Sequence, residues 1–337
     1  MKRRLLSSLI TGPLVVVCMF VFSGVAAGDT VYVDPNGSAD FTTIQDAINA
    51  AIDGQEVVVR PGTYVENINM SGKAITLRST DPTDPAVITS TIIDGDAWHS
   101  VITCYSGEEP NTVISGFVIT NGLEGHGGGM HNYNNSSPTI TNCTFSGNYA
   151  EHGGGMFNRD SSPTVTNCTF SGNTAYITAG GMRNVYSSPT VSNCTFSGNT
   201  ALGYEYSGDS GGIHNSLSSP TISNCTFSGN AAADLGGGMC NHSSSPTVTN
   251  CTFSGNTANG GGGMYNNESS PMVKDSYFCS NTPDQILGGY TDNGGNNMAY
   301  CPPPSPLKPE YEGDVDGDGD VDFDDFALMA ANWLEGK

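Results

Sequence analysis

The sequence predicts an all-β protein built as a parallel β-helix, a solenoid whose coils are made of short strands. One phrase, seen in Ser162-Pro-Thr-Val-Thr-Asn-Cys-Thr-Phe-Ser-Gly-Asn173, recurs from Thr112 to Asn281. The alternating Thr and Val of each cycle favour strands over helices, and Gly and Asn mark the turns. A fixed period of this length is typical of a solenoid. Its five cysteines are 25, 26, 31 and 26 residues apart, at Cys143, Cys168, Cys194, Cys225 and Cys251.

The composition narrows the possible partners. Hydrophobic residues make up 36% and charged residues 13% of the 337 residues, which is polar for a globular protein without a repeat. The net charge is -22, with 11 Lys and Arg against 33 Asp and Glu. Nucleic acids and anionic membrane surfaces are therefore unfavourable partners, because both need clustered cations. Acidic polymers are unfavourable as well, unless calcium bridges them.

The first 27 residues have the pattern of a secretory signal peptide. Three basic residues, 2–4, precede an apolar run over 14–22, and small residues at 25–27 suit cleavage after Ala27. The run is too short to span a bilayer, and no later run is longer, so no membrane span is expected. A lipoprotein cleavage before Cys18 is disfavoured because the preceding residue is not small. We expect a secreted protein, extracellular or at the cell surface.

The segment after the signal peptide predicts a helical cap for the solenoid. Within residues 41–52, Ile44, Ala47, Ile48 and Ala51 form one apolar helical stripe. A solenoid needs a cap over its first coil, because the core there is otherwise open to water. Less regular coils are expected between this helix and the repeat. The predicted solenoid domain covers residues 28–301, with regular coils over about 112–281.

The parity of the apolar residues predicts a bend in each coil. Ile140 is out of phase with Cys143 and Phe145 along a strand, so the chain must bend between them. Asn142 is the predicted bend residue, because Asn tolerates the left-handed region. With that bend all three side chains point inward, and the same slots recur in every coil. A fourth inward column is predicted to contain Met130, Met156, Met182, Ile213, Met239 and Met264.

Asparagines and cysteines also form columns. Two Asn columns are expected to stack their amides and satisfy backbone groups at the turns, one from Asn142 to Asn250 and one from Asn148 to Asn281. The five repeat cysteines are interpreted as small core thiols, in preference to metal ligands or disulfides, because parallel Cβ vectors suit a disulfide poorly. Any disulfide is expected among the cysteines outside this column, which are Cys104, Cys240, Cys279 and Cys301.

Two phrases resemble a known superfamily. Phe41-Thr-Thr-Ile-Gln-Asp-Ala-Ile48 and Val57-Val-Val-Arg-Pro-Gly-Thr-Tyr-Val-Glu66 resemble the opening of the pectin-lyase-like right-handed β-helix proteins, which include pectin methylesterases. The Asn-Cys-Thr-Phe-Ser-Gly-Asn and Gly-Gly-Gly-Met phrases resemble repeats of secreted bacterial β-helix proteins and polymorphic outer-membrane proteins. The resemblance spans residues 30–297 and implies a right-handed parallel β-helix. It leaves activity open, because this fold serves lyases, hydrolases, esterases and adhesins.

The catalytic motifs of those enzymes are largely missing. Of the polygalacturonase motifs, the chain contains Gly125-His126-Gly127, within a Gly-rich run. The strongest functional signal is the longer cycle between residues 199 and 213, because loops on rigid scaffolds often carry function. An acid–base cluster is hypothesised from Glu151, His152, Glu205 and Asp209. The predicted sugar-binding residues are Tyr204, Tyr206, Phe157, Arg183 and His214, and random variation on a solvated face is the alternative.

The C-terminal segment carries a predicted calcium site. Residues 302–309 form a Pro-rich linker, and residues 310–337 contain a twelve-residue loop with Gly at its sixth position. The loop and the following apolar stripe resemble a dockerin, although dockerins have two such loops and this chain has one. The resemblance implies Ca²⁺ binding and a cohesin-like or envelope protein as partner. The predicted ligands are Asp314, Asp316, Asp318, Asp320, Asp322 and Asp325.

Three functions remain open from the sequence. The favoured one is a secreted or cell-surface β-helix that binds polysaccharide or another surface component and is attached through its calcium-binding tail. The second is a polysaccharide lyase or glycoside hydrolase. The third is a non-catalytic structural spacer or adhesin.

Overall fold

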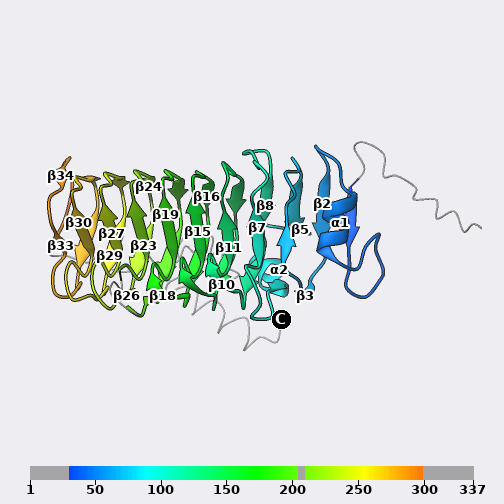
Figure 1. Cartoon of the computed structure of the whole chain (residues 1–337), viewed down its shortest axis with the longest axis horizontal. Helices are drawn as coiled ribbons and strands as arrows, with labels where there is room; N and C mark the ends of the chain where they lie inside the picture. The colour runs from blue at the N-terminus through cyan, green and yellow to red at the C-terminus, as the bar shows by residue number, and fades with distance from the viewer. Residues whose placement is uncertain (1–29, 204–208, 299–337) are drawn as a thin grey trace, which may run out of the picture.

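The protein is a rod of stacked coils, as the computed structural model shows (Figure 1). The structure describes residues 30–203 and 209–298, and the predicted signal peptide, linker and calcium loop lie outside this range. Every strand pairs parallel with its equivalent in the next coil, which confirms the predicted parallel solenoid. Within residues 30–203 and 209–298 no helix combines the length and apolar character that a membrane span requires.

The strands form four sheets, which we call A to D. Sheet A contains β1(Val31–Val33), β2(Glu56–Val59), β5(Thr76–Ser79), β8(Val113–Ser115), β12(Thr139–Thr141), β16(Thr164–Thr166), β20(Thr190–Ser192), β24(Thr221–Ser223), β28(Thr247–Thr249), β31(Met272–Lys274) and β34(Thr291–Asp292). Sheet B contains β3(Gly62–Val65), β6(Thr91–Asp94), β9(Val118–Thr120), β13(Thr144–Ser146), β17(Thr169–Ser171), β21(Thr195–Ser197), β25(Thr226–Ser228), β29(Thr252–Ser254) and β32(Tyr277–Cys279).

The other two sheets build the opposite side of each coil. Sheet C contains β4(Ile68–Asn69), β7(Ile102–Cys104), β11(Met130–Asn132), β15(Met156–Arg159), β19(Met182–Val185), β23(Ile213–Ser216), β27(Met239–His242), β30(Met264–Asn267) and β33(Ile286–Leu287). Sheet D contains β10(Leu123–His126), β14(Tyr149–His152), β18(Thr174–Thr178), β22(Thr200–Ala201) and β26(Ala231–Ala232). Along the chain a regular coil passes through A, B, D and then C.

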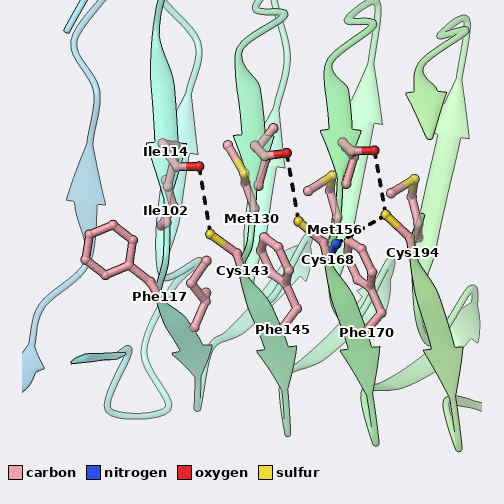
Figure 2. Close-up of a cluster of buried hydrophobic side chains, with 14 of the residues drawn as sticks. Ile102, Ile114, Phe117, Met130, Cys143, Phe145, Met156, Cys168, Phe170 and Cys194 are labelled. Carbon is pink, nitrogen blue, oxygen red and sulfur yellow. Dashed lines mark hydrogen bonds between the residues drawn. The ribbon is translucent and has the colours of Figure 1, made fainter. Parts of the chain in front are cut away.

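The predicted bend between sheets A and B is confirmed. Asn142 has a φ of 54°, and its equivalents in the next four coils have φ between 51° and 55°. Ile140, Cys143 and Phe145 are all buried as a result. The phenylalanine rings of adjacent coils stack nearly parallel, with centroids 4.4–5.0 Å apart. The predicted inward Met column is fully buried too. Figure 2 shows these columns side by side in the core.

The cysteine column consists of buried free thiols, as predicted. Each thiol donates to backbone carbonyls; Cys143 Sγ lies 3.3 Å from the Thr141 oxygen and 3.8 Å from the Ile114 oxygen of the preceding coil (Figure 2). Among the cysteines outside the column, Cys104 and Cys240 are also free. Cys279 is disulfide-bonded, which agrees with the prediction that disulfides occur outside the column.

Three asparagine columns run along the rod. The outer one, at the bend, and the buried one from Asn148 to Asn281 were predicted. A third, from Asn132 to Asn266 in sheet C, is buried and joined by amide–amide hydrogen bonds of 2.8–2.9 Å; the sequence analysis did not identify it as a ladder.

Two helices are described. Helix α1(Ile44–Ala50) begins after the N-cap Thr43 and buries Ile44, Ala47 and Ile48, three of the four residues of the predicted stripe. The fourth, Ala51, is buried as well but is the C-cap residue, so the helix is shorter than the predicted 41–52. It contacts β1, β2 and β4 at the N-terminal end of the rod (Figure 1), and its role as a cap remains a prediction. Helix α2(Pro85–Ser90), which was not predicted, has no buried residue and contacts β6 and β9.

Candidate functional site

The outward face of sheet C carries one varied side chain per coil. In β15, Met156 and Asn158 point into the core, so Phe157 between them points outward. Its equivalents in neighbouring coils are in register across the sheet. We call this set the floor column, and it comprises His131, Phe157, Arg183, His214, Cys240 and Tyr265.

The floor column is largely covered, although strand alternation predicts an outward face open to solvent. Phe157 is only 3% exposed and His214 only 4%. The segment that follows sheet D covers this column. It turns sharply at residues with a left-handed backbone conformation, such as Gly153, whose φ is 67°. A Cβ on Gly153 would lie 3.1 Å from the Phe157 Cβ, so this turn lies directly over the floor. The residues preceding the turns form a second column, the ridge, which comprises His126, His152, Thr178 and Asp209.

A groove opens beside the ridge over the earlier coils. A hollow of about 490 Å³ adjoins another of about 340 Å³, and the two share His126, His131 and Tyr133. The larger hollow is also lined by Asn67, His99, Ser100, Thr103, Tyr105 and Glu124. The smaller one is also lined by Asn134, Phe157, Arg159 and Asp160. Together they form one hollow that spans several coils.

Aromatic rings line this groove in a continuous series. Tyr105 stacks on Tyr133 with ring centroids 5.3 Å apart, and Tyr133 lies 4.5 Å from His131. His126 lies 5.8 Å from His131 and 4.7 Å from Phe157. The rings come from three successive coils, and because the solenoid backbone fixes each one, the series is preformed.

Three histidines in or beside the groove, His126, His131 and His152, favour the neutral state. Burial, reinforced by the nearby charge of His126, lowers the pKa of His131 from 6.5 to about 4. Burial and the charge of Arg183 lower the pKa of His126 and bring that of His152 to about 3. At neutral pH each ring therefore offers one donor and one acceptor.

An imidazole–carboxylate pair lines the larger hollow, and an arginine–aspartate ion pair lines the smaller one. Glu124 Oε2 lies 2.8 Å from His99 Nδ1, and this hydrogen bond lowers the pKa of the Glu124 carboxyl. In the smaller hollow, Arg159 Nε lies 3.7 Å from Asp160 Oδ2. Both pairs are substantially exposed, so a bound molecule has access to them.

A second cluster lies further along the same face. Asp209, His214, Cys240 and His242 bring their ligand-type atoms within 4.8 Å of one another. Asp209 Oδ2 lies 3.3 Å from His242 Nε2 and 3.8 Å from His214 Nε2. Burial lowers the pKa of His214 well below 6.5 and raises that of the Cys240 thiol well above 9.0.

Arg183 lies between the groove and this cluster. Its guanidinium carbon lies 5.7 Å from the centre of the Phe157 ring, a cation–π distance. Burial lowers the Arg183 pKa to about 10, and the charge of Asp209 opposes this shift. Its Nε is buried without a hydrogen-bond partner among the described residues.

The structure brings together some of the predicted site residues. Phe157, Arg183 and His214 occupy successive coils of the floor, but they are buried or nearly so, and Phe157 alone lines the groove. His152 and Asp209 both lie on the ridge, two coils apart with Thr178 between them. Glu151 is an exposed residue of β14. The remaining predicted residues lie outside the described range, namely Tyr204, Glu205, Tyr206, Asp314, Asp316, Asp318, Asp320, Asp322 and Asp325.

Sequence reasoning missed most of the groove. Tyr105 and His99 precede the regular repeat, so no column identified them. Tyr133 follows the Asn of its cycle, in a position that varies from coil to coil. The Gly125-His126-Gly127 phrase was the available signal: Gly127 has a φ of 63° and makes the turn that places His126 on the ridge.

Comparisons with known proteins agree with this architecture. A pectin methylesterase from carrot aligns with 82% of this chain and 90% of its own, at 9% identity and a TM-score of 0.48. A mannuronic acid specific polysaccharide family 6 lyase from human gut microbiota aligns with 73% of this chain at 14% identity and a TM-score of 0.50, and this chain spans 59% of the lyase. At 14% identity the likeness to the lyase shows the fold alone. No curated protein sequence matched.

A family model assigns the repeat region directly. The model described as "Right handed beta helix region" matches residues 68–235 and again 184–301, which together cover more than half of the chain. The match agrees with the parallel pairing of every sheet described above. The chain therefore belongs to the right-handed β-helix family.

Proposed function

We propose that this protein binds a neutral polysaccharide or cell-surface glycan in the groove along sheet C. The observation that carries the proposal is the preformed series of rings from Tyr105 through Tyr133 to His131. Aromatic faces stack on sugar rings, and neighbouring polar groups bind the hydroxyls. The hollow extends across several coils, as an extended polymer requires.

The charges favour a neutral glycan over a uronic acid polymer. The groove contains two carboxylates, Glu124 and Asp160, against the single guanidinium of Arg159. The chain as a whole carries a net charge of -22. An anionic polymer would meet repulsion from both sources, unless calcium screened it.

Replacing a groove tyrosine tests the proposal. Tyr133→Ala removes the ring that stacks on Tyr105, and we expect the affinity for the bound glycan to fall by about tenfold or more. Calorimetry against a panel of neutral and acidic polysaccharides measures this. Tyr32→Ala is the matched control, because Tyr32 is an exposed tyrosine on sheet A. Equal affinity of Tyr133→Ala and wild type would contradict groove binding.

Polysaccharide cleavage is the second candidate. The His99–Glu124 pair favours it, because a carboxylate that orients an imidazole is a common acid–base arrangement. New reducing ends or unsaturated products from the same panel would show turnover. Loss of turnover in Glu124→Gln, with glycan affinity retained, would assign the pair a catalytic role. A protein that neither binds nor cleaves any glycan would instead be a spacer.

The C-terminal segment is proposed as the attachment site of a secreted protein. Six of the seven aspartates of the loop are at ligand positions and supply the oxygen ligands that Ca²⁺ prefers, and without metal these carboxylates repel one another. A cohesin-like or envelope protein is the proposed partner. We expect residues 310–337 to gain helicity on adding calcium. Identical circular dichroism spectra of this segment in calcium and in chelator would refute the calcium site.

A further inference from the structure

The cluster on sheet C beyond the groove joins two coils. Asp209 lies on the ridge and His214 on β23, while Cys240 and His242 lie on β27, the next strand of the sheet. His214 and Cys240 are direct register partners. The four side chains therefore converge from two coils and from both the ridge and the floor.

The cluster leaves buried polar atoms unsatisfied. Asp209 Oδ1 and His214 Nδ1 are buried and have no hydrogen-bond partner among the described residues. The side chains of Asp209 and His214 are only 9% and 5% exposed. Buried polar atoms are normally paired, so these two atoms point to a ligand that the site would take up.

We propose that Asp209, His214, Cys240 and His242 bind a zinc ion. One thiolate, two imidazoles and one carboxylate are the donor types that zinc takes in proteins, usually four at a time. Calcium, which prefers six to eight oxygen atoms, does not fit this set. On binding, the Cys240 thiol gives its proton to solvent and the sulfur coordinates the metal.

The geometry requires only small side-chain movements. The four ligand atoms lie within 4.8 Å of one another, whereas tetrahedral bonds of about 2.0–2.3 Å place ligand atoms roughly 3.3–3.8 Å apart. Rotations that move each atom by about 1 Å close the difference without moving the strands. The guanidinium carbon of Arg183 lies 5.7 Å from the centre of the Phe157 ring, and its charge acts on Asp209 and His214.

Four protein ligands would complete the coordination, which is typical of a structural zinc site. The ion would fasten Asp209 and His214 to the following coil through Cys240 and His242. Asp209 closes the longest cycle of the repeat, where 31 residues separate the repeat cysteines Cys194 and Cys225. The metal would thus hold the end of this longer cycle, at Asp209 and His214, against the following coil. This inference rests on a different observation from the glycan proposal.

Cobalt substitution of the full-length chain tests the site. The protein is stripped with chelator, kept anaerobic and titrated with Co²⁺ in excess calcium, which occupies sites made of oxygen ligands. We expect one equivalent of Co²⁺ to bind and to give a thiolate-to-cobalt charge-transfer band and the d–d bands of a tetrahedral site. Adding Zn²⁺ should displace the Co²⁺ and remove these bands. Cys240→Ala should lose the charge-transfer band. Cys104→Ala, which removes another buried free thiol, should keep it.

A second variant keeps the test decisive if Cys240→Ala does not fold. His242 is partly exposed, so His242→Ala should fold and should bind Zn²⁺ at least about a hundredfold more weakly. Zinc should raise the melting temperature of the wild type and not that of His242→Ala. Absence of the band in folded wild type, its survival in Cys240→Ala, or unchanged zinc affinity in His242→Ala would each overturn the proposal.

Discussion

One buried asparagine per coil connects three coils through its side chain. Asn199 Oδ1 accepts from the backbone and side-chain nitrogens of Asn173, at 3.1 and 2.9 Å. Its Nδ2 donates to the Phe170 oxygen and to Asn230 Oδ1, both at 2.9 Å. A side chain of another type cannot make all four bonds, so the column repeats Asn for a physical reason.

Asn199→Ala should therefore destabilise the protein strongly. It removes all four side-chain bonds and leaves two nitrogens of Asn173 and the Phe170 oxygen without the Asn199 side chain, whereas Asn230 Oδ1 keeps the backbone N–H of residue 199. We expect a loss of about 3 kcal/mol in the free energy of unfolding. Asn193→Gly is the control, because Asn193 is exposed at the bend and Gly keeps its positive φ. Urea unfolding of both variants measures the difference. Equal losses would show that the buried ladder adds little.

His131 should make the stability depend on pH. Its folded pKa of about 4 lies below the ordinary 6.5, so the unfolded chain binds a proton there first as the pH falls. The free energy of unfolding should therefore decrease from pH 6.5 towards pH 4. We expect His131→Gln to show a shallower decrease over this window and no change of slope above pH 7. Parallel slopes for the two proteins in urea titrations would contradict this assignment.

At the scale of the element, the glycines before the Met column set how closely the coils approach. A Cβ on Gly155 would lie 2.6 Å from the Gly181 oxygen and 2.9 Å from the Phe170 ring. Gly172 differs, since it has a φ of 61° but no atom within 4 Å of its would-be Cβ. Gly155 is therefore needed for close packing between coils, and Gly172 is needed for its left-handed backbone conformation.

The two glycines should respond differently to alanine. Gly155→Ala forces backbone apart between coils and should cost about 3 kcal/mol or more. Gly172→Ala adds only a left-handed non-Gly residue, which costs about 1–2 kcal/mol. Thermal and urea unfolding compare the pair. A Gly172→Ala variant as unstable as Gly155→Ala would mean that φ, rather than inter-coil contact, dominates.

Features that repeat in every coil of the sequence were predictable, and features that do not repeat were missed. The bend at Asn142 and the Phe, Cys and Met columns were predictable because apolar parity repeats in every coil. The groove was not, because Tyr105 and His99 come from early coils that lack the repeat. The burial of the floor column was missed for another reason: the turns at residues such as Gly153 fold the ridge over it, and strand alternation alone gives an outward side chain.

Across the whole molecule, each coil contacts mainly its two neighbours (Figure 1). Stability in such a rod is close to a sum of coil and interface contributions, so opening begins at the ends. We expect amide hydrogen exchange to be slowest in central strands such as β16 and β20 and faster in β33 and β34. Mass spectrometry of exchanged peptides measures this. Equal protection of the amides in all strands would instead indicate that the rod unfolds as a single cooperative unit.

Successive coils carry the same core residues at the same positions, so evolution can change the length of the rod. Val165 and Val191 are register partners in the same slot, and so are Phe170 and Phe196. Recombination that deletes residues 165–190 would join Thr164 to Val191 and keep every column in phase. The rod would shorten by about 4.8 Å and lose Arg183, while the residues that line the groove and those of the four-residue cluster would remain. Unequal crossing-over within the repeat can thus change the separation of two sites without requiring a new fold.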